Sequence, residues 1–143
     1  MVMRERFERE LNELRADILK MGDMVDDELK LALRALETLD VSLAKQVQLA
    51  DKQVNQTRFD LENKCTTLIV TQQPAARDLR SIIAAMNMIV DIERMGDQAK
   101  GIAKVIPHML QHPDSPRPAE LRQMGSMVSQ MLRQAMTAYA HHN

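Results

Sequence analysis

Two pairs of oxygen-bearing side chains, each pair spaced at i and i+4, are the parts of this 143-residue sequence best suited to chemistry. Glu93 and Asp97 form one pair, and Asp51 and Asn55 form the other. Residues at this spacing project from the same face of a helix. If the two helices run antiparallel, the four side chains could converge on one patch and bind a hard cation or iron.

The same pairs also have an ordinary structural explanation. Acidic residues at this spacing are common on solvated helix faces, and cations such as Arg58 or Lys100 could neutralise them. Glu93, however, continues an apolar stripe, where a carboxylate is costly unless it is paired or ligated. Gly96 lies between the two acids and would let a neighbouring helix or an ion approach closely. Two hypotheses therefore stand side by side: a metal site, or interhelical hydrogen bonding of buried polar groups.

Other reactive side chains indicate no second site. His108 and His112 have the spacing of helical zinc ligands, but no acid lies between them and prolines flank them, which favours a solvated pair. Cys65 continues an apolar seam and is expected in the core. The sequence shows no nucleophile–base arrangement and no glycine-rich phosphate loop, so we predict that the protein is not an enzyme.

Helices must position these residues, because the composition disfavours a sheet. Hydrophobic residues make up 45% of the chain but aromatic residues only 2%, and there are 12 methionines. Such a composition, poor in β-branched and aromatic residues, is typical of helical proteins. Apolar residues recur at intervals of three and four along most of the chain, which predicts long amphipathic helices. The fold class that we expect is all-α.

Turn residues divide this periodicity into four predicted helices. The first should end at Asp40, and the second should end at the turn before Pro74, where the third begins. Pro107, together with the proline-rich stretch that follows, should end the third helix. The fourth should run from about Ala119 to the final His141-His142-Asn143. The third helix carries two apolar stripes, so we expect it to lie centrally among the others.

The fourth predicted helix resembles the first. Residues 21–25 (Met-Gly-Asp-Met-Val) align with residues 124–128 (Met-Gly-Ser-Met-Val). We therefore predict a three-helix repeat over 1–110, a proline-rich linker over 111–118, and the first helix of an incomplete second repeat over 119–143. The expected architecture is an antiparallel up-and-down three-helix bundle, with the fourth helix packed on it or swapped.

The fourth helix also carries an apolar face that this repeat leaves without partners. The face includes Met124, Val128, Met131 and Leu132. An apolar face seldom stays exposed, so we expect dimerisation or helix exchange.

Three segments carry a family resemblance. They are Asp-Lys-Gln-Val-Asn at 51–55, Gln-Gln-Pro-Ala-Ala-Arg-Asp-Leu-Arg at 72–80, and Asp-Ile-Glu-Arg-Met-Gly-Asp-Gln-Ala at 91–99. In order and spacing they resemble the first repeat of the PhoU family, the regulators of bacterial phosphate-specific transport. The resemblance implies a three-helix bundle that is repeated twice in the full-length protein, so the present chain is expected to be truncated.

The resemblance also implies function and partners. It implies a cytoplasmic homodimer that negatively regulates phosphate uptake and phosphate-starvation signalling, between the transporter's ATPase subunit and a membrane sensor histidine kinase. Asp78, Arg80 and Arg94 are the candidates for contacting such partners.

Some PhoU-like proteins bind iron or zinc clusters through paired acidic motifs. The resemblance carries that role to Asp51, Asn55, Glu93 and Asp97, although a neutral Asn55 and the missing second acidic repeat weaken the pattern. Iron, zinc or another divalent cation is thus the possible cofactor. The alternative function is a metal-binding helical bundle that stores or senses a cation.

Charge and hydropathy exclude other classes of partner. A net charge of −1 and two Phe with one Tyr leave neither the basic footprint nor the stacking platforms that nucleic-acid binding uses. No apolar run is long enough to span a membrane. The charged N-terminus is unlike a signal peptide, and a single cysteine fits a reducing compartment, so we expect a cytoplasmic protein.

Overall fold

The computed structural model describes residues 2–141, with side chains from Arg4 onward. It contains four helices, α1 (Val2–Thr38), α2 (Val41–Gln72), α3 (Ala76–Met109) and α4 (Glu120–Ala140), and no strand in this range. The all-α expectation is therefore confirmed. His142 and Asn143, which the sequence placed at the end of the fourth helix, lie outside the described residues.

The helix ends have local causes in the sequence. Asp40 caps α2, because its side chain accepts a hydrogen bond of 3.1 Å from the backbone N–H of Leu43. At the other end of α2, Gln73 adopts the left-handed conformation and its N–H donates to the carbonyl of Ile69. Pro74 then prevents the helix from continuing. These features produce the tight connections that the sequence predicted.

The third helix does not stop at Pro107, because α3 continues to Met109. A proline inside a helix removes only its own N–H, here the one that would bond to the carbonyl of Ala103. This loss is tolerated near the end of α3, where the helix stops soon afterwards. Pro107 and the proline-rich stretch after it were together expected to end the helix, and α3 ends between them.

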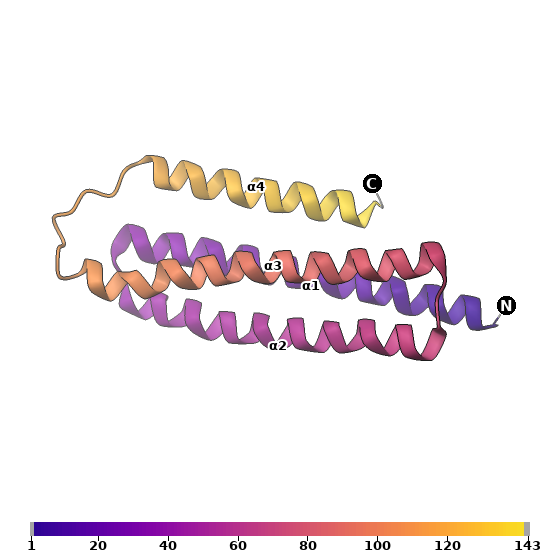
Figure 1. The fold of residues 1–143 in the computed structure, drawn as a ribbon. Helices are drawn as coiled ribbons and strands as arrows, with labels where there is room; N and C mark the ends of the chain where they lie inside the picture. The colour runs from indigo at the N-terminus through magenta and orange to yellow at the C-terminus, as the bar shows by residue number, and fades with distance from the viewer. Residues whose placement is uncertain (1, 142–143) are drawn as a thin grey trace.

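The first three helices form an up-and-down bundle, and α4 lies along its outside (Figure 1). The contacts Asp17–Lys64 and Met24–Thr57 run in opposite sequence order along α1 and α2, so these helices are antiparallel. The ion pairs Arg58–Glu93 and Asp51–Lys100 show the same for α2 and α3. Among the described residues α4 packs against α1 alone. The central helix is therefore α1 and not α3. The second apolar stripe of α3 is divided between core and edge. Ile92, Ala99 and Ile106 are buried in the core, whereas Met88, Met95 and Ile102 are partly buried against it.

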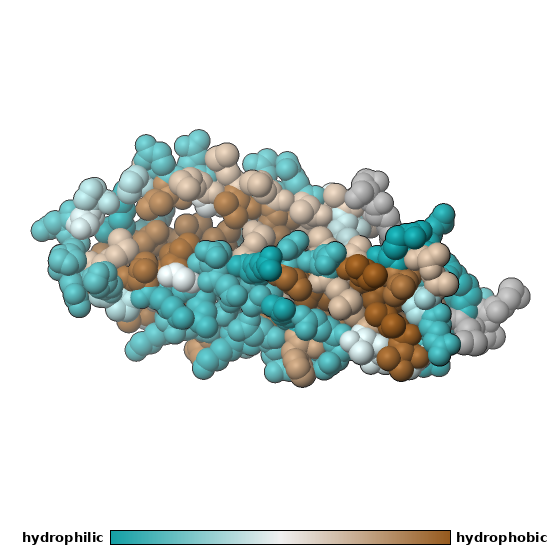
Figure 2. All heavy atoms as spheres, in the orientation of Figure 1, coloured by the Kyte–Doolittle hydropathy of each residue, from teal (hydrophilic) through white to brown (hydrophobic). Residues whose placement is uncertain are grey.

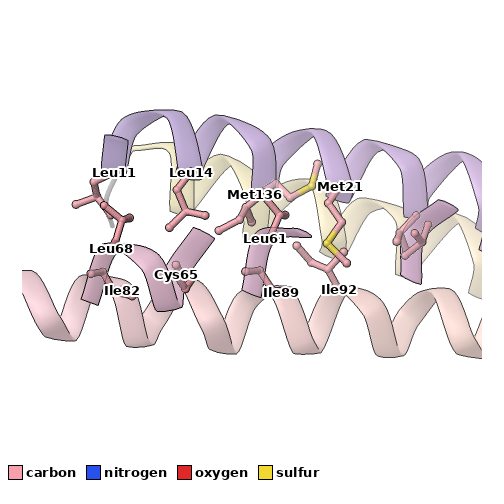
Figure 3. Close-up of a cluster of buried hydrophobic side chains, with 14 of the residues drawn as sticks. Leu11, Leu14, Met21, Leu61, Cys65, Leu68, Ile82, Ile89, Ile92 and Met136 are labelled. Atoms are coloured by element: carbon pink, nitrogen blue, oxygen red, sulfur yellow. The ribbon is translucent and has the colours of Figure 1, made fainter. Parts of the chain in front are cut away.

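The core is a long seam of aliphatic side chains shared by all four helices. Figure 3 shows its larger cluster, in which leucines of α1 and α2 meet isoleucines of α3, and Met136 enters from α4. Cys65 is fully buried there, as expected, and burial raises the pKa of its thiol to about 11. The long apolar seam holds the polar groups described below in fixed register.

The packing of α4 on α1 is nearly two-fold symmetric. A Cβ added at Gly22 would overlap Met136, and a Cβ added at Gly125 would overlap Leu33. The alignment that matches Gly22 with Gly125 also matches Leu33 with Met136, so the two contacts are equivalent under exchange of the helices. The two glycines let antiparallel helices approach closely at both ends of their contact.

Candidate functional site

The candidate site is a group of acids in the middle of the bundle, where α1, α2 and α3 meet. Asp51 and Glu93, from α2 and α3, are only 1% and 7% exposed. A third buried acid, Glu28 on α1, joins them at 1% exposure. The sequence pairs therefore do lie on facing helices, and the first helix contributes a carboxylate of its own.

Glu28 is the most perturbed acid of the described residues. No donor group reaches either carboxylate oxygen of Glu28 or Oδ1 of Asp51, so these oxygens can hydrogen-bond only if one of the two acids is protonated. Burial, then the charge of Asp51 and hydrogen bonding with it, raise the pKa of Glu28 to about 9. At neutral pH Glu28 is therefore protonated in the folded protein, and its O–H is available to the neighbouring acceptor oxygen of Asp51.

Asp51 is satisfied on its other side. Its Oδ2 accepts a hydrogen bond of 3.3 Å from Nδ2 of Asn55 and lies 3.8 Å from Nζ of Lys100. Asn55 therefore acts as a hydrogen-bond donor to Asp51, but this bond lies within α2 and is not the interhelical hydrogen bond that the sequence had offered as the alternative. The neutral amide at this position helps to hold one buried negative charge.

Glu93 has a cation of its own. Its Oε2 accepts a hydrogen bond of 2.7 Å from Nη1 of Arg58, which also binds Glu62 at 2.6 Å. Burial and then the neighbouring Asp97 raise the pKa of Glu93, and Arg58 opposes this rise. Asp97 itself is exposed. The i and i+4 acids thus share one face, as predicted, with one inside the bundle and one in solvent.

This arrangement does not fit a metal centre as it stands. Within residues 2–141, no group of three or more His, Cys, Asp or Glu side chains is placed to hold a metal ion. Arg58 and Lys100 already pair with Glu93 and Asp51, so two of the expected ligands have cationic partners. The assignment of Asp51, Asn55, Glu93 and Asp97 to a metal remains a prediction that this geometry does not support.

Gly96 lies directly against the acidic site, beside Glu28 and Asp51. A Cβ at this position would lie 3.1 Å from Oε1 of Glu28 and 3.3 Å from Oδ1 of Asp51. We expect Gly96→Val to lower the free energy of unfolding by about 1–3 kcal/mol, because it overpacks a buried polar site. Urea titration would measure the change. Gly101→Val is the matched control, since a Cβ there meets nothing within 4 Å; an equal loss in both variants would refute the steric explanation.

Sequence reasoning missed Glu28 and a second buried acid, Asp26. Glu28 continues the apolar stripe of α1 between Val25 and Ala32, so the signal was present: it is the argument that singled out Glu93. Asp26 gives no such signal, because its position faces α4, whose docking site the sequence did not specify.

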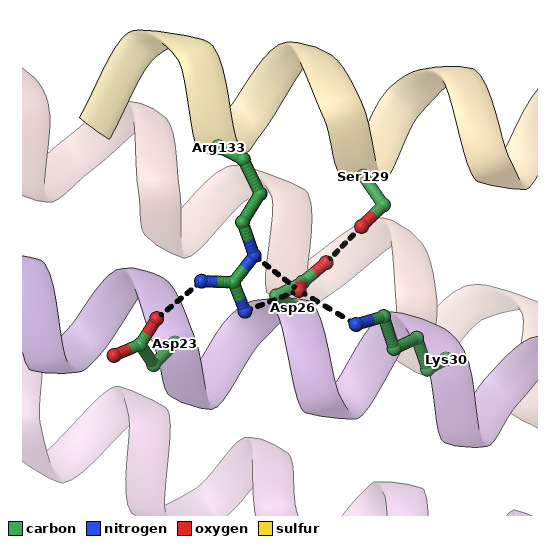
Figure 4. A network of polar contacts seen from close by, with 5 residues as sticks. All are labelled: Asp23, Asp26, Lys30, Ser129 and Arg133. Carbon is green, nitrogen blue, oxygen red and sulfur yellow. Dashed lines mark hydrogen bonds and ion pairs between the residues drawn. The ribbon is translucent and has the colours of Figure 1, made fainter. Parts of the chain in front are cut away.

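Asp26 anchors α4 to α1 (Figure 4). It is fully buried, and its carboxylate accepts hydrogen bonds of 2.5 Å from Oγ of Ser129 and 2.7 Å from Nη2 of Arg133. Lys30 adds an ion pair at 3.1 Å. Burial acts to raise the pKa of Asp26, but the hydrogen bonds from Ser129, Arg133 and Lys30 outweigh it and hold the pKa below its usual value. The buried charge is therefore fully compensated.

The residues predicted to contact partners fall into two groups. Asp78 is half-buried at the start of α3 and forms an ion pair with Arg4 of α1, so it already has a partner within the chain. Arg80 and Arg94 are exposed on α3. They lie on one side of that helix, about four turns apart. Of the three candidates, these two arginines are therefore the ones that present their charge to solvent.

His108 and His112 do not form a ligand pair. His108 lies in the last turn of α3 and His112 beyond its end, with ring centroids 6.2 Å apart. Both are exposed, as the sequence predicted. None of the helices in the described part of the chain is both long enough and apolar enough to cross a membrane.

The fold and the site together define a class: antiparallel helical bundles with acidic side chains buried where the helices meet. Residues 18–106 match the PhoU domain family. The chain belongs to the PhoU family.

Individual relatives agree with this assignment. The chain is 37% identical over 137 residues to a phosphate-specific transport system accessory protein PhoU homolog of Pseudomonas putida, covering 95% of this chain and 54% of the relative. The crystal structure of PhoU from Pseudomonas aeruginosa superposes with a TM-score of 0.88 at 36% identity, over 94% of this chain and 65% of that one. A phosphate transport system regulatory protein PhoU from Streptococcus pneumoniae gives 0.85 at 34% identity, over 96% and 64%. The chain thus spans roughly half to two thirds of their length.

Proposed function

We propose that this chain is a cytoplasmic regulatory accessory protein of a bacterial phosphate transporter, acting by binding other proteins and not by catalysis. The family match carries the proposal, because residues 18–106 include all of α2 and most of α1 and α3. Relatives that align with nearly the whole chain are named accessory proteins of phosphate-specific transport.

The proposal also covers the sign of the regulation and the partner proteins. The chain is a negative regulator that links the ATPase subunit of the transporter to a membrane sensor histidine kinase. Long, charged, solvent-facing helix surfaces support this, since electrostatic complementarity sets the choice and rate of protein association. On α3, Arg80 and Arg94 are exposed and offer two cations to an acidic partner surface. Homodimerisation belongs to the same proposal.

We also infer that α4 is the counterpart of α1 in a second repeat, joined to the first by the linker at 111–118. The near two-fold packing of Gly22 and Gly125 supports this inference. Ser129 occupies the position that aligns with Asp26, and these two side chains hydrogen-bond to each other. A residue pair that maps onto itself lies on the axis relating two equivalent helices.

Charge reversal on α3 tests the partner surface. We expect the double variant Arg80→Glu, Arg94→Glu to bind the transporter's ATPase subunit about tenfold more weakly. Two cations at the edge of the interface would be replaced by anions, which repel an acidic partner surface. Isothermal titration calorimetry with the purified subunit measures this. Arg34→Glu, an exposed reversal on α1, is the matched control.

A reporter of the phosphate-starvation response tests the function separately. Cells that lack the chain should express the reporter in phosphate-rich medium, and the wild-type chain should restore repression. A reporter that stays repressed without the chain would refute negative regulation, whatever the binding result. Unchanged affinity of the double variant would instead refute only the α3 surface.

A further inference from the structure

Apolar side chains line the outer seam between α2 and α3, on the side of these helices that does not face α1. On α3, four of them are spaced by four, three and four residues, which places them on one side of the helix. On α2, two of them are eleven residues apart, which is about three turns, so they also share a side. We call these six residues the seam patch: Leu79, Ile83, Met86 and Val90 of α3, with Phe59 and Val70 of α2.

Half of the seam patch is open to solvent. Phe59, Val70 and Ile83 are 60%, 67% and 45% exposed, and the other three residues are half-buried. Figure 2 shows hydrophobic surface over the start of α3 and the end of α2, at the right of the view. The chain has only two phenylalanines, and the other one, Phe7, is buried in the core. Large apolar side chains that gather on one surface mark an interaction site.

The surroundings of the seam patch lack charge, although the chain as a whole is 27% charged. Residues 65–76 and residues 81–90 contain no Asp, Glu, Lys or Arg. The ion pairs Asp51–Lys100 and Arg58–Glu93 set the register of α2 against α3, and this register places 65–70 opposite 81–86. A helix surface that faces only water normally carries charged residues. Loss of charge from both helices at the same place is instead typical of the core of a protein interface.

No helix among the described residues covers the seam patch. On the inner side of the pair, α1 fills the seam between α2 and α3, where side chains of all three helices form the core. The backbone of α4 lies close to α1 and to neither α2 nor α3. The outer seam therefore stays open when α4 is docked.

The outer seam has the shape and the bordering charges to receive a helix. The groove between two packed helices accepts the side-chain ridge of a third, as α1 shows on the inner side. A hollow of about 320 Å³ continues the seam beside Phe59 and Glu93. Arg80 precedes Ile83 by three residues and Arg94 follows Val90 by four, so each arginine adjoins the seam patch. Neither arginine forms an ion pair with any side chain that the structure describes.

We propose that an amphipathic helix of a partner protein docks lengthwise in the outer seam, with its apolar side on the seam patch and acidic side chains beside Arg80 and Arg94. A helix binds a groove through apolar residues spaced by three and four, and the rows of the seam patch match that spacing. The two arginines are separated by about 21 Å along α3, which a partner helix of about four turns spans. This inference rests on the proposed function, whose partner, the ATPase subunit of the transporter, supplies the helix.

Isothermal titration calorimetry with the purified ATPase subunit tests the seam patch. Ile83→Glu and Phe59→Glu should each weaken binding at least tenfold, because each places a charge inside an apolar contact. Leu49→Glu is the matched control and should bind as the wild type does. Leu49 is also 60% exposed on α2, but it lies ten residues from Phe59 and on a different side of the helix. Circular dichroism should show the same helicity in all three variants.

Hydroxyl-radical labelling of the wild-type complex tests where the partner binds and with which element. Phe59 and Ile83 should lose reactivity when the ATPase subunit is bound, whereas Leu49 should keep it. On the subunit, the protected residues should be spaced by three and four along one helix, with Asp or Glu beside them. Protection confined to loops of the subunit, or unchanged reactivity of Phe59 and Ile83, would overturn the proposal.

The binding results separate this inference from the proposed function. If Ile83→Glu and Phe59→Glu both bind the ATPase subunit as tightly as the wild type, the seam patch is not the docking site, and the regulatory role is unaffected. If the wild-type chain does not bind the subunit at all, the partner in the proposed function is wrong, and the docked helix is refuted with it.

Discussion

Glu28→Gln is expected to stabilise the folded protein by about 3 kcal/mol at pH 7. The pKa of Glu28 is raised from 4.5 to about 9, so between these values the folded state holds a proton that the unfolded state has released. The contribution of protonated Glu28 to the free energy of unfolding is therefore fully present below pH 4.5 and is lost as pH rises toward 9. Glutamine cannot lose this proton, so the variant avoids the loss, which reaches about 3 kcal/mol at neutral pH.

Urea unfolding at pH 5, 7 and 8 measures this effect. The advantage of Glu28→Gln should grow with each step in pH, and the variant should show the flatter profile. Glu13→Gln, an exposed change on the same helix, should leave the profile as in the wild type. A variant that is less stable than the wild type at pH 8 would contradict a protonated Glu28.

Asp26→Ala is expected to release α4 from the bundle. The change removes the acceptor of Ser129 and Arg133, and each hydrogen bond to a charged group contributes about 1.5–3 kcal/mol. Because the backbone of α4 lies close to α1 alone among the described residues, we expect the loss to fall on the docking of α4. Limited proteolysis should then cut the 111–118 linker and degrade α4 while the three-helix bundle persists.

The matched control for Asp26→Ala is Asp23→Ala. Asp23 binds the same Arg133, but its side chain is 56% exposed, so its removal should change stability by less than about 1 kcal/mol. Acid should reproduce the Asp26→Ala effect: the pKa of Asp26 lies below its usual 3.8, so its contribution is present above that pH and is lost as pH falls through the folded value. Equal protease resistance of wild type and Asp26→Ala would refute the anchor.

Most of the fold could be predicted from the sequence, because its causes are local. Asp40 and Pro74 interrupt the apolar periodicity, and each lies where a helix begins or ends in the structure. The centre of the bundle could not be predicted in the same way. Two apolar stripes on α3 suggested a central helix, but periodicity shows only that a face is covered and not which helix covers it.

The candidate site was also predicted only in part, because residue spacing identifies the face of a helix but not the contacts that this face makes. The i and i+4 spacing correctly placed Glu93 and Asp97 on one face of α3, with Asp51 on the helix that faces it. The spacing could not reveal that Arg58 forms an ion pair with Glu93, because that contact depends on the register of α2 against α3. Nor could it reveal that Asp26 would be buried, since this depends on a helix far along the chain.

The restriction of α4 to a single neighbour has a consequence for the order of events during synthesis. Contacts among α1, α2 and α3 join helices that are neighbours in sequence or one helix apart, so the bundle can form as these segments emerge from the ribosome. The hydrogen bond of Asp26 with Ser129 can form only after more than a hundred further residues have been synthesised. Until α4 docks, Gly22 and the carboxylate of Asp26, which is buried in the complete fold, are exposed to water. The nascent chain therefore passes through a stage in which α1 presents an unoccupied binding surface.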